Sequence, residues 1–170
     1  GAGGTNRKVA ASRIKTYASG NLVQRVFTPS DGSAQTGSTV VPLDDSIPQN
    51  DELNEFMTAS ITPTNSSNIL IIEATYCGAN ATGSGSQTIV CLYQDDTADA
   101  LCCSLGSAPG NACDYVSVRH KMTAGTASST TFKMRAGSNQ EGNVYFQSTG
   151  GSDQYGGVVK CYIDIMEIAA

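Results

Sequence analysis

The closing stretch of the chain, Gly157-Val-Val-Lys-Cys-Tyr-Ile-Asp-Ile-Met-Glu-Ile168, indicates the fold most directly. Successive side chains of a β-strand point to opposite faces. Both predicted faces are apolar and are interrupted only by Asp164; one carries Cys161, Ile163 and Ile165, and the other carries Tyr162, Met166 and Ile168. A strand that is apolar on both faces is typical of a central position in a sheet or of contact with a partner.

The preceding residues continue as short apolar segments separated by turns rich in Gly, Ser, Thr and Asn. Residues 69–72, Ile-Leu-Ile-Ile, are again apolar on both faces, whereas residues 115–122 and 130–136 alternate as half-buried strands do. No segment has a sustained helical period. About nine or ten strands at intervals of roughly 8 to 12 residues predict an all-β, antiparallel two-sheet sandwich, and a jelly roll accommodates this number of strands.

Charge divides the chain into two parts. Residues 1–20 contain no acidic residue and four basic ones, Arg7, Lys8, Arg13 and Lys15. Residues 21–170 carry 6 basic and 15 acidic residues. We therefore predict a basic N-terminal arm or neck over 1–20 and one β-sandwich domain over 21–170, which is an ordinary size for a single domain.

The acidic domain argues against nucleic-acid binding, because it repels phosphates. The arm has two interpretations, a solvated terminus or a tether that docks on an acidic surface of a larger particle. No segment approaches the roughly 20 apolar residues of a membrane-spanning helix, and no apolar segment of a signal peptide follows the basic residues. We expect neither membrane insertion nor export, with the reservation that a chain beginning at Gly1 is compatible with trimming.

The six cysteines do not have the spacing of a metal site, because there is no Cys-x-x-Cys pair and only one histidine. Three of them lie within apolar strand patterns, where a free thiol packs as a small buried residue; these are Cys77, Cys91 and Cys161. Cys103 and Cys113 bracket a turn-rich loop that a disulfide could close, with Cys102 as the competing partner.

The residue types that carry catalysis are poorly represented. His120 shares its predicted strand face with Val116, Val118 and Met122, and no Gly-x-Ser-x-Gly motif or thiol-protease signature accompanies it. We expect a core or interface histidine and predict that the protein is not an enzyme.

Acidic residues gather in two predicted turns, at 44–45 and at 95–99, without the spacing of a calcium-binding loop. Glycoside hydrolysis would place paired carboxylates in a cleft beside sugar-stacking aromatic residues, and the chain has no Trp. We predict no catalytic, cofactor-binding or metal-binding residue. Tyr155, at the tip of a Gly-rich loop, is a candidate contact for a glycan or receptor.

A series of short motifs resembles a family of C-terminal domains in phage tail fibres and other phage structural proteins, known mostly from marine and metagenomic sequences. The motifs span about residues 22–168 and are Val23-Gln-Arg-Val-Phe27, Val41-Pro-Leu-Asp-Asp45, Ile47-Pro-Gln-Asn50, Glu55-Phe-Met-Thr-Ala-Ser-Ile-Thr-Pro63, Leu92-Tyr-Gln-Asp-Asp-Thr-Ala-Asp-Ala100, Met122-Thr-Ala-Gly-Thr126, Ser128-Ser-Thr-Thr-Phe-Lys-Met-Arg135 and Ile163-Asp-Ile-Met-Glu-Ile168.

This resemblance implies a virion structural protein whose domain is a jelly-roll knob of the tail-fibre or C1q/TNF-like kind. It also implies a homotrimer on the surface of a phage particle, assembled in the host cytoplasm, attached to other virion proteins through the arm and able to bind a host-surface glycan or protein. The family lends no functional residues. The alternatives are a capsid decoration or minor capsid protein, a carbohydrate-binding module and a cytokine-like ligand.

The two segments that are apolar on both faces, 69–72 and 162–168, are the predicted subunit contact, because they need more cover than one sandwich core supplies. Asp164 lies within this surface and would need a partner there. The candidate partners are Lys160, Lys133 and Arg135.

Overall fold

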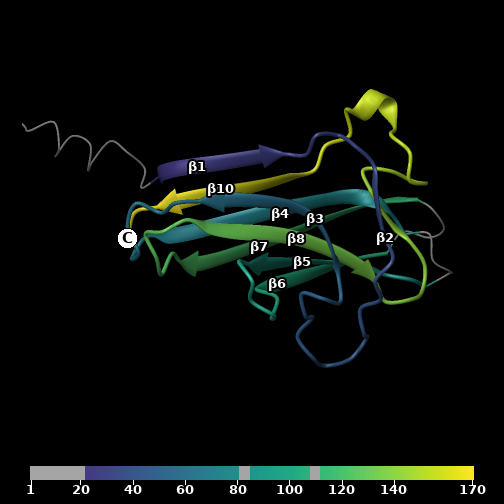
Figure 1. Cartoon of the computed structure of the whole chain (residues 1–170), viewed down its shortest axis with the longest axis horizontal. Helices are drawn as coiled ribbons and strands as arrows, with labels where there is room; N and C mark the ends of the chain where they lie inside the picture. Colours follow the sequence, from purple (N-terminus) through teal and green to yellow (C-terminus); the bar gives the residue numbers. More distant parts are fainter. Residues whose placement is uncertain (1–21, 81–84, 108–111) are drawn as a thin grey trace, which may run out of the picture.

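The computed structural model describes residues 22–80, 85–107 and 112–170 (Figure 1). The elements of this part of the chain are strands and one short 3₁₀ helix: β1 (Leu22–Pro29), β2 (Gln35–Gly37), β3 (Asn54–Ile61), β4 (Ile69–Asn80), β5 (Thr88–Gln94), β6 (Cys102–Gly106), β7 (Cys113–Thr123), β8 (Thr130–Ser138), β9 (Val144–Phe146), η1 (Tyr155–Gly157) and β10 (Tyr162–Ile168).

Two antiparallel sheets form the sandwich. In the first, called here the β4 sheet, β1 pairs with β10, β10 pairs with β4, and β7 pairs with the other edge of β4; the short β9 and β2 extend this sheet. The second, the β5 sheet, has the order β3-β8-β5-β6.

The strand order identifies the fold as a jelly roll. With the short β2 and β9 set aside, the first, eighth, third and sixth long strands lie side by side in the β4 sheet. The second, seventh, fourth and fifth long strands form the β5 sheet. Apart from the paired β5 and β6, consecutive long strands thus alternate between the sheets, as in two interlocked Greek keys. The predicted all-β jelly-roll sandwich is confirmed.

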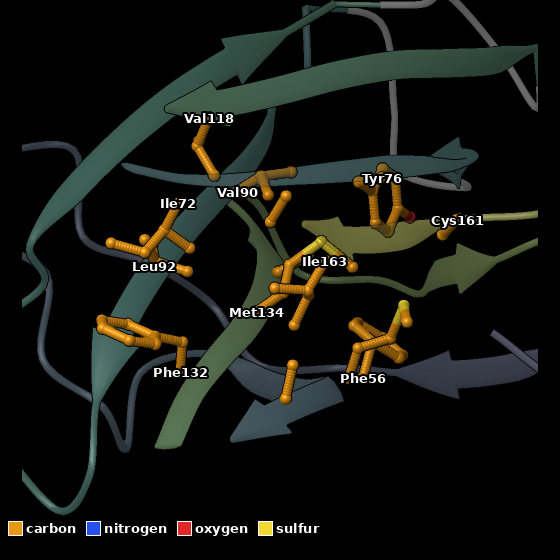
Figure 2. Close-up of a cluster of buried hydrophobic side chains, with 14 of the residues drawn as sticks. Phe56, Ile72, Tyr76, Val90, Leu92, Val118, Phe132, Met134, Cys161 and Ile163 are labelled. Carbon is orange, nitrogen blue, oxygen red and sulfur yellow. The ribbon is translucent and has the colours of Figure 1, made fainter. Parts of the chain in front are cut away.

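The main core lies between the sheets (Figure 2). Leu70, Ile72 and Ala74 of β4 face it and are fully buried, as are Phe132 and Met134 of β8. The alternation predicted for residues 130–136 is therefore confirmed: over this range every second residue is buried and those between are half-buried. Burying a Phe or Leu side chain contributes roughly 1.5–3 kcal/mol, and this regular pattern is what holds the two sheets face to face.

An aromatic group fills the end of the core toward β9. The rings of Phe56 and Phe146 stack with their centroids 5.1 Å apart, and Tyr76 lies 5.9 Å from Phe146. The Tyr76 hydroxyl donates a hydrogen bond of 2.7 Å to the carbonyl of Tyr145, so its one polar atom is satisfied although the residue is fully buried.

The β5 sheet is covered on its second face by the chain itself. Residues 38–53, between β2 and β3, cross this face, and Val41 and Leu53 pack there on Ile89, Cys91 and Tyr93 of β5. The sequence predicts a short β segment over 37–43, and this is wrong: β2 ends at Gly37, and the following residues are held by an isolated bridge. The prolines at 42 and 48 suit such a crossing segment, since proline cannot donate a ladder hydrogen bond.

A buried carboxylate closes the end of the sandwich where the chain ends. Glu167 of β10 is fully buried, and its two oxygens accept hydrogen bonds from Gln24 Nε2 at 2.6 Å and from Asn68 Nδ2 at 2.6 Å. The amide and the hydroxyl of Thr64 donate two more, at 2.9 and 2.8 Å. Burial alone would raise the pKa of Glu167, but the bonds from these three residues together lower it to about 2.

Candidate interaction surfaces

The outer face, defined as the side of the β4 sheet that points away from the β5 sheet, is the surface that the sequence predicts as a subunit contact. The side chains of β4 alternate between the core and this face: Leu70 and Ile72 are fully buried, whereas Ile69 and Ile71 are half-buried. The outer face is made up of Arg25 and Phe27 of β1, Tyr162, Asp164, Met166 and Ile168 of β10, Ile69, Ile71, Glu73, Thr75 and Cys77 of β4, and Cys113, Tyr115, Ser117, Arg119, Lys121 and Thr123 of β7.

The centre of the outer face is apolar. Strand register places Ile71 beside Met166 and Ile69 beside Ile168, so four apolar side chains form one block on the two central strands. All four are half-buried. The side of the β5 sheet that faces away from the β4 sheet is covered by residues 38–53, which form a second buried cluster with β5. On the outer face of the β4 sheet, the described residues form no such cluster. The prediction that both strands are apolar on two faces is confirmed.

Asp164 finds its partner within the same sheet. Its two oxygens accept hydrogen bonds from Nε and Nη2 of Arg25 on β1, both at 2.8 Å. The Asp164 side chain is 12% exposed and that of Arg25 is 53% exposed. The hydrogen bonds and the charge of Asp164 raise the pKa of Arg25.

The partners predicted for Asp164 are therefore wrong. Lys160 donates instead to the carbonyl of Asp31, Lys133 pairs with Asp96, and Arg135 pairs with Glu55. The reason is topological, because a jelly roll pairs its first and last strands. Arg25 on β1 thereby comes opposite Met166, which lies two residues from Asp164 on the same face of β10.

The outer face has an aromatic edge beside this ion pair. Phe27 is 52% exposed, and its ring centroid lies 5.4 Å from that of Tyr162. The Arg25 guanidinium carbon lies 5.6 Å from the Phe27 ring centroid, within the range of a cation–π contact. The Tyr162 hydroxyl donates to Glu73 at 3.0 Å. These contacts hold the exposed ring of Phe27 in place next to the apolar block.

A second candidate surface lies at the opposite end of the sandwich. Leu22 pairs with Ile168, so the described chain starts and finishes at one end, while η1 lies at the other (Figure 1). Tyr155 is 81% exposed there and Val158 is 72% exposed. Tyr155 has φ 51° and is followed by two glycines with positive φ. A bulky residue in this region is strained, and such strain is commonest where a loop has a functional role.

The loop between β1 and β2 contacts the segment between β9 and β10 that carries Tyr155. The carboxylate of Asp153 accepts a hydrogen bond from the amide of Ala34 at 2.7 Å, and Lys160 donates to the carbonyl of Asp31 at 2.5 Å. A Cβ added at Gly32 would lie 2.2 Å from the carbonyl oxygen of Gly157, so the two loops touch along their backbones. The exposed ring of Tyr155 is thus carried by an anchored loop.

The residues that were weighed for catalysis or metal binding, and not predicted to serve either, lie on separate elements. His120 is half-buried on β7, on the side of Val116 and Val118, as predicted. Asp95 lies in the turn that follows β5. Its carboxylate accepts hydrogen bonds from Thr130 Oγ1 and from the amide of Thr131. Among the described residues, no three or more His, Cys, Asp or Glu side chains are grouped so that they could hold a metal ion.

The cysteine pairing differs from the prediction. Cys103 forms a disulfide with Cys91, its direct neighbour across β5 and β6, and not with Cys113 or Cys102. Cys77 and Cys161 are free thiols, as expected, and Cys161 is fully buried. The expectation of a free thiol at Cys91 is wrong, because this residue is buried in the disulfide with Cys103. The predicted pairing is wrong because Cys103 lies in the β5 sheet, whereas Cys113 begins a strand of the β4 sheet.

The basic arm, with Arg7, Lys8, Arg13 and Lys15, lies outside the described residues, and its role stays a prediction. Of the residues that are described, none belongs to a helix with the length and hydropathy of a membrane span.

Comparison with known proteins gives similarity of structure only. Neither a comparison with protein families nor one with curated proteins yields a match. Among solved structures, Eiger TNF from S. frugiperda is similar over 85% of this chain and 93% of its own, with 10% identity and a TM-score of 0.48. Dimeric latent PorU from Porphyromonas gingivalis is similar over 89% of this chain and 14% of its own, with 9% identity and a TM-score of 0.41. At these scores the assignment of the jelly roll rests on the strand order above.

Arg25 is the residue of the outer face that sequence reasoning missed. The signal was present, since residues 21–28 read as a strand and Arg25 is the only basic residue in it. A jelly roll places its first strand next to its last, which would have brought Arg25 to Asp164.

Proposed function

We propose that the protein is a virion structural protein, a tail-fibre or spike knob that assembles as a homotrimer and mediates attachment to a host surface. The observation that supports assembly is the apolar block of Ile69, Ile71, Met166 and Ile168 on the outer face, which no second cluster of described residues covers. The virion role rests on the motif resemblance. The proposal includes no enzymatic activity.

A second copy of the chain fits the outer face better than the basic arm does. The charged residues of this face are Arg25, Arg119 and Lys121 against Glu73 and Asp164. The face is thus not acidic, and an arm with four basic residues would meet like charges there. A copy of the same sandwich offers both an apolar block and paired charges, which suits a symmetric assembly.

The position of the two ends supports a knob. The arm would leave from the end at which Leu22 and Ile168 pair, and would dock there on other virion proteins. The opposite end, with Tyr155, would then point away from the particle. An exposed aromatic ring on an anchored loop suits contact with a sugar ring or with an apolar patch of a receptor.

The oligomer is tested by native mass spectrometry and light scattering on the wild type and two variants. We expect a trimer for the wild type, a monomer for Ile71→Glu, and a trimer for the matched control Thr58→Glu. Thr58 is an exposed strand residue of the β5 sheet, so its replacement adds the same charge away from the outer face. A wild type that is monomeric at high concentration, or an Ile71→Glu variant that stays trimeric, contradicts the proposed assembly.

Cryo-electron microscopy of intact particles tests the virion role. Three-fold density at a fibre tip supports a knob. A regular lattice over the shell supports the alternative of a capsid decoration or minor capsid protein, and absence from the particle contradicts both.

The second candidate function is a carbohydrate-binding module, and the 81% exposure of Tyr155 is the observation that favours it. Glycan-array binding by the isolated protein that Tyr155→Ala abolishes and Tyr155→Phe retains supports this function. Release of product from any glycan contradicts the proposal of a non-enzymatic protein.

A further inference from the structure

We propose that Cys77 and Cys113 are the site of a second disulfide, which joins β4 to β7 within the β4 sheet. This inference concerns covalent chemistry and stands apart from the proposed function. It assigns a role to two of the four thiols that the Cys91–Cys103 disulfide leaves free.

The strand register brings the two thiols to one place. Cys77 lies opposite Tyr115, and Cys113 lies opposite Ala79 two residues away. Residues two apart on a strand point to the same face, so both thiols stand on the outer face as diagonal neighbours. The Cys113 thiol is also near enough to raise the pKa of Cys77, in addition to the larger effect of burial.

A small movement of the first residue of β7 would bring Cys113 within disulfide distance of Cys77. Diagonal neighbours lie about 7–8 Å apart between Cα atoms, slightly more than the upper end of the range for disulfides. Cys113 is the first residue of β7, and its pairing with Ala79 is the last of the β4–β7 ladder. A movement of Cys113 toward Cys77 therefore leaves the ladder from Gly78 and Asp114 onward in place.

The other two free thiols lack this opportunity. Cys161 is fully buried, and burial raises its pKa to about 12; its Sγ approaches the backbone of Cys77, at 3.1 Å from the amide nitrogen. Cys102 is half-buried, packs against the main core, and has its pKa raised by burial to about 11. Both stay protonated at neutral pH, and only a thiolate attacks a disulfide.

The disulfide would form in two thiol–disulfide exchange steps, and the exposed Cys113 reacts before the half-buried Cys77. With a low-molecular-weight disulfide such as oxidised glutathione as the oxidant, the exposed Cys113 thiolate attacks one sulfur, the glutathione S–S bond breaks, and one glutathione thiolate leaves. Cys77, whose pKa is raised by burial and then by Cys113, loses its proton second and attacks Cys113 Sγ. The second glutathione thiolate leaves. Two protein thiols are oxidised, one glutathione disulfide is reduced, and the two protons end on the two glutathione thiols.

The second disulfide would enclose the first. The segment from Cys77 to Cys113 contains all of β5 and β6, and Cys91–Cys103 lies within it. Each sheet would then carry one crosslink between neighbouring strands. β7 is an edge of the outer face, so the new crosslink would fix that edge to the central strand β4.

The test counts and locates free thiols. The full chain is incubated with oxidised and reduced glutathione at pH 8, quenched with acid, unfolded in guanidinium chloride and labelled with N-ethylmaleimide, and intact mass and peptide mapping follow. We expect two labels, on Cys102 and Cys161, and a peptide that joins Cys77 to Cys113. In the Cys113→Ser variant the expected count rises from two to three, with Cys77 as the additional site.

Three results would overturn the proposal. The first is four or more labels on the wild type after oxidation. The second is Cys113 joined to Cys102 or Cys103. The third is a Cys113 disulfide between two copies, which a non-reducing gel would show as a crosslinked dimer.

Discussion

Glu167 offers a sharp test of how the end of the sandwich is held together. We consider the replacement Glu167→Gln, which preserves the size of the side chain and removes its charge. The wild-type carboxylate accepts four hydrogen bonds, from Gln24, from Asn68 and two from Thr64. A neutral amide accepts them more weakly, and its own NH₂ group must face at least one of these donors.

The size of the effect follows from the lowered pKa. A shift from 4.5 to about 2 corresponds to about 3 kcal/mol, and the hydrogen bonds that the glutamine amide can still make lower the expected loss to about 2 kcal/mol. The folded pKa lies below the unfolded one, so this stabilisation is present above pH 4.5 and is lost as the pH falls toward 2. The variant, which has no carboxyl group to titrate at this position, lacks this part of the pH dependence.

Urea unfolding at pH 7 and pH 3 measures the prediction. At pH 7 we expect the free energy of unfolding of the variant to be about 2 kcal/mol lower than that of the wild type. At pH 3 the difference should shrink to about 1 kcal/mol or less, because most of the linkage has been lost. A difference that is the same at both pH values would refute the role assigned to the charge. A Glu141→Gln variant is the control, since Glu141 is an exposed carboxylate between β8 and β9.

Two further predictions concern the outer face and the core. Replacing Arg25 by Gln leaves Asp164 without its cation, and we expect a loss of stability that becomes smaller in 1 M salt. A loss that does not depend on salt would indicate packing in place of charge. Replacing the fully buried Phe132 by Ala should lower the free energy of unfolding by about 3–5 kcal/mol. The same replacement at the half-exposed Phe27 should lower it by less than about 1 kcal/mol. Similar losses at both positions would be incompatible with the core described.

The local pattern of the strands was predictable because side-chain alternation is a property of the strand itself. Residues 130–136 predicted the buried face of β8, and residues 162–168 predicted a strand that is apolar on both sides. For the same reason His120 was placed correctly on the side of Val116 and Val118. These inferences need only the period of two and a difference in hydropathy.

The pairing of distant residues was not predictable from these patterns. Asp164 was expected to meet Lys160, Lys133 or Arg135 and meets Arg25, which lies 139 positions earlier in the chain. Cys103 was expected to pair with Cys113 or Cys102 and pairs with Cys91 on the neighbouring strand. In both cases the partner depends on which strands become neighbours, and side-chain alternation carries no information on strand order.

The sequence by itself therefore determined an all-β sandwich, the inward face of its strands and the two segments that are apolar on both sides. Only the tertiary structure decided what those second faces do. Residues 38–53 fold over the β5 sheet, whereas the outer face of the β4 sheet gains no second cluster from the described residues. The physical reason is that burial is a property of neighbours in space: the same apolar side chain belongs to a core or to an interface according to which segment comes to lie against it.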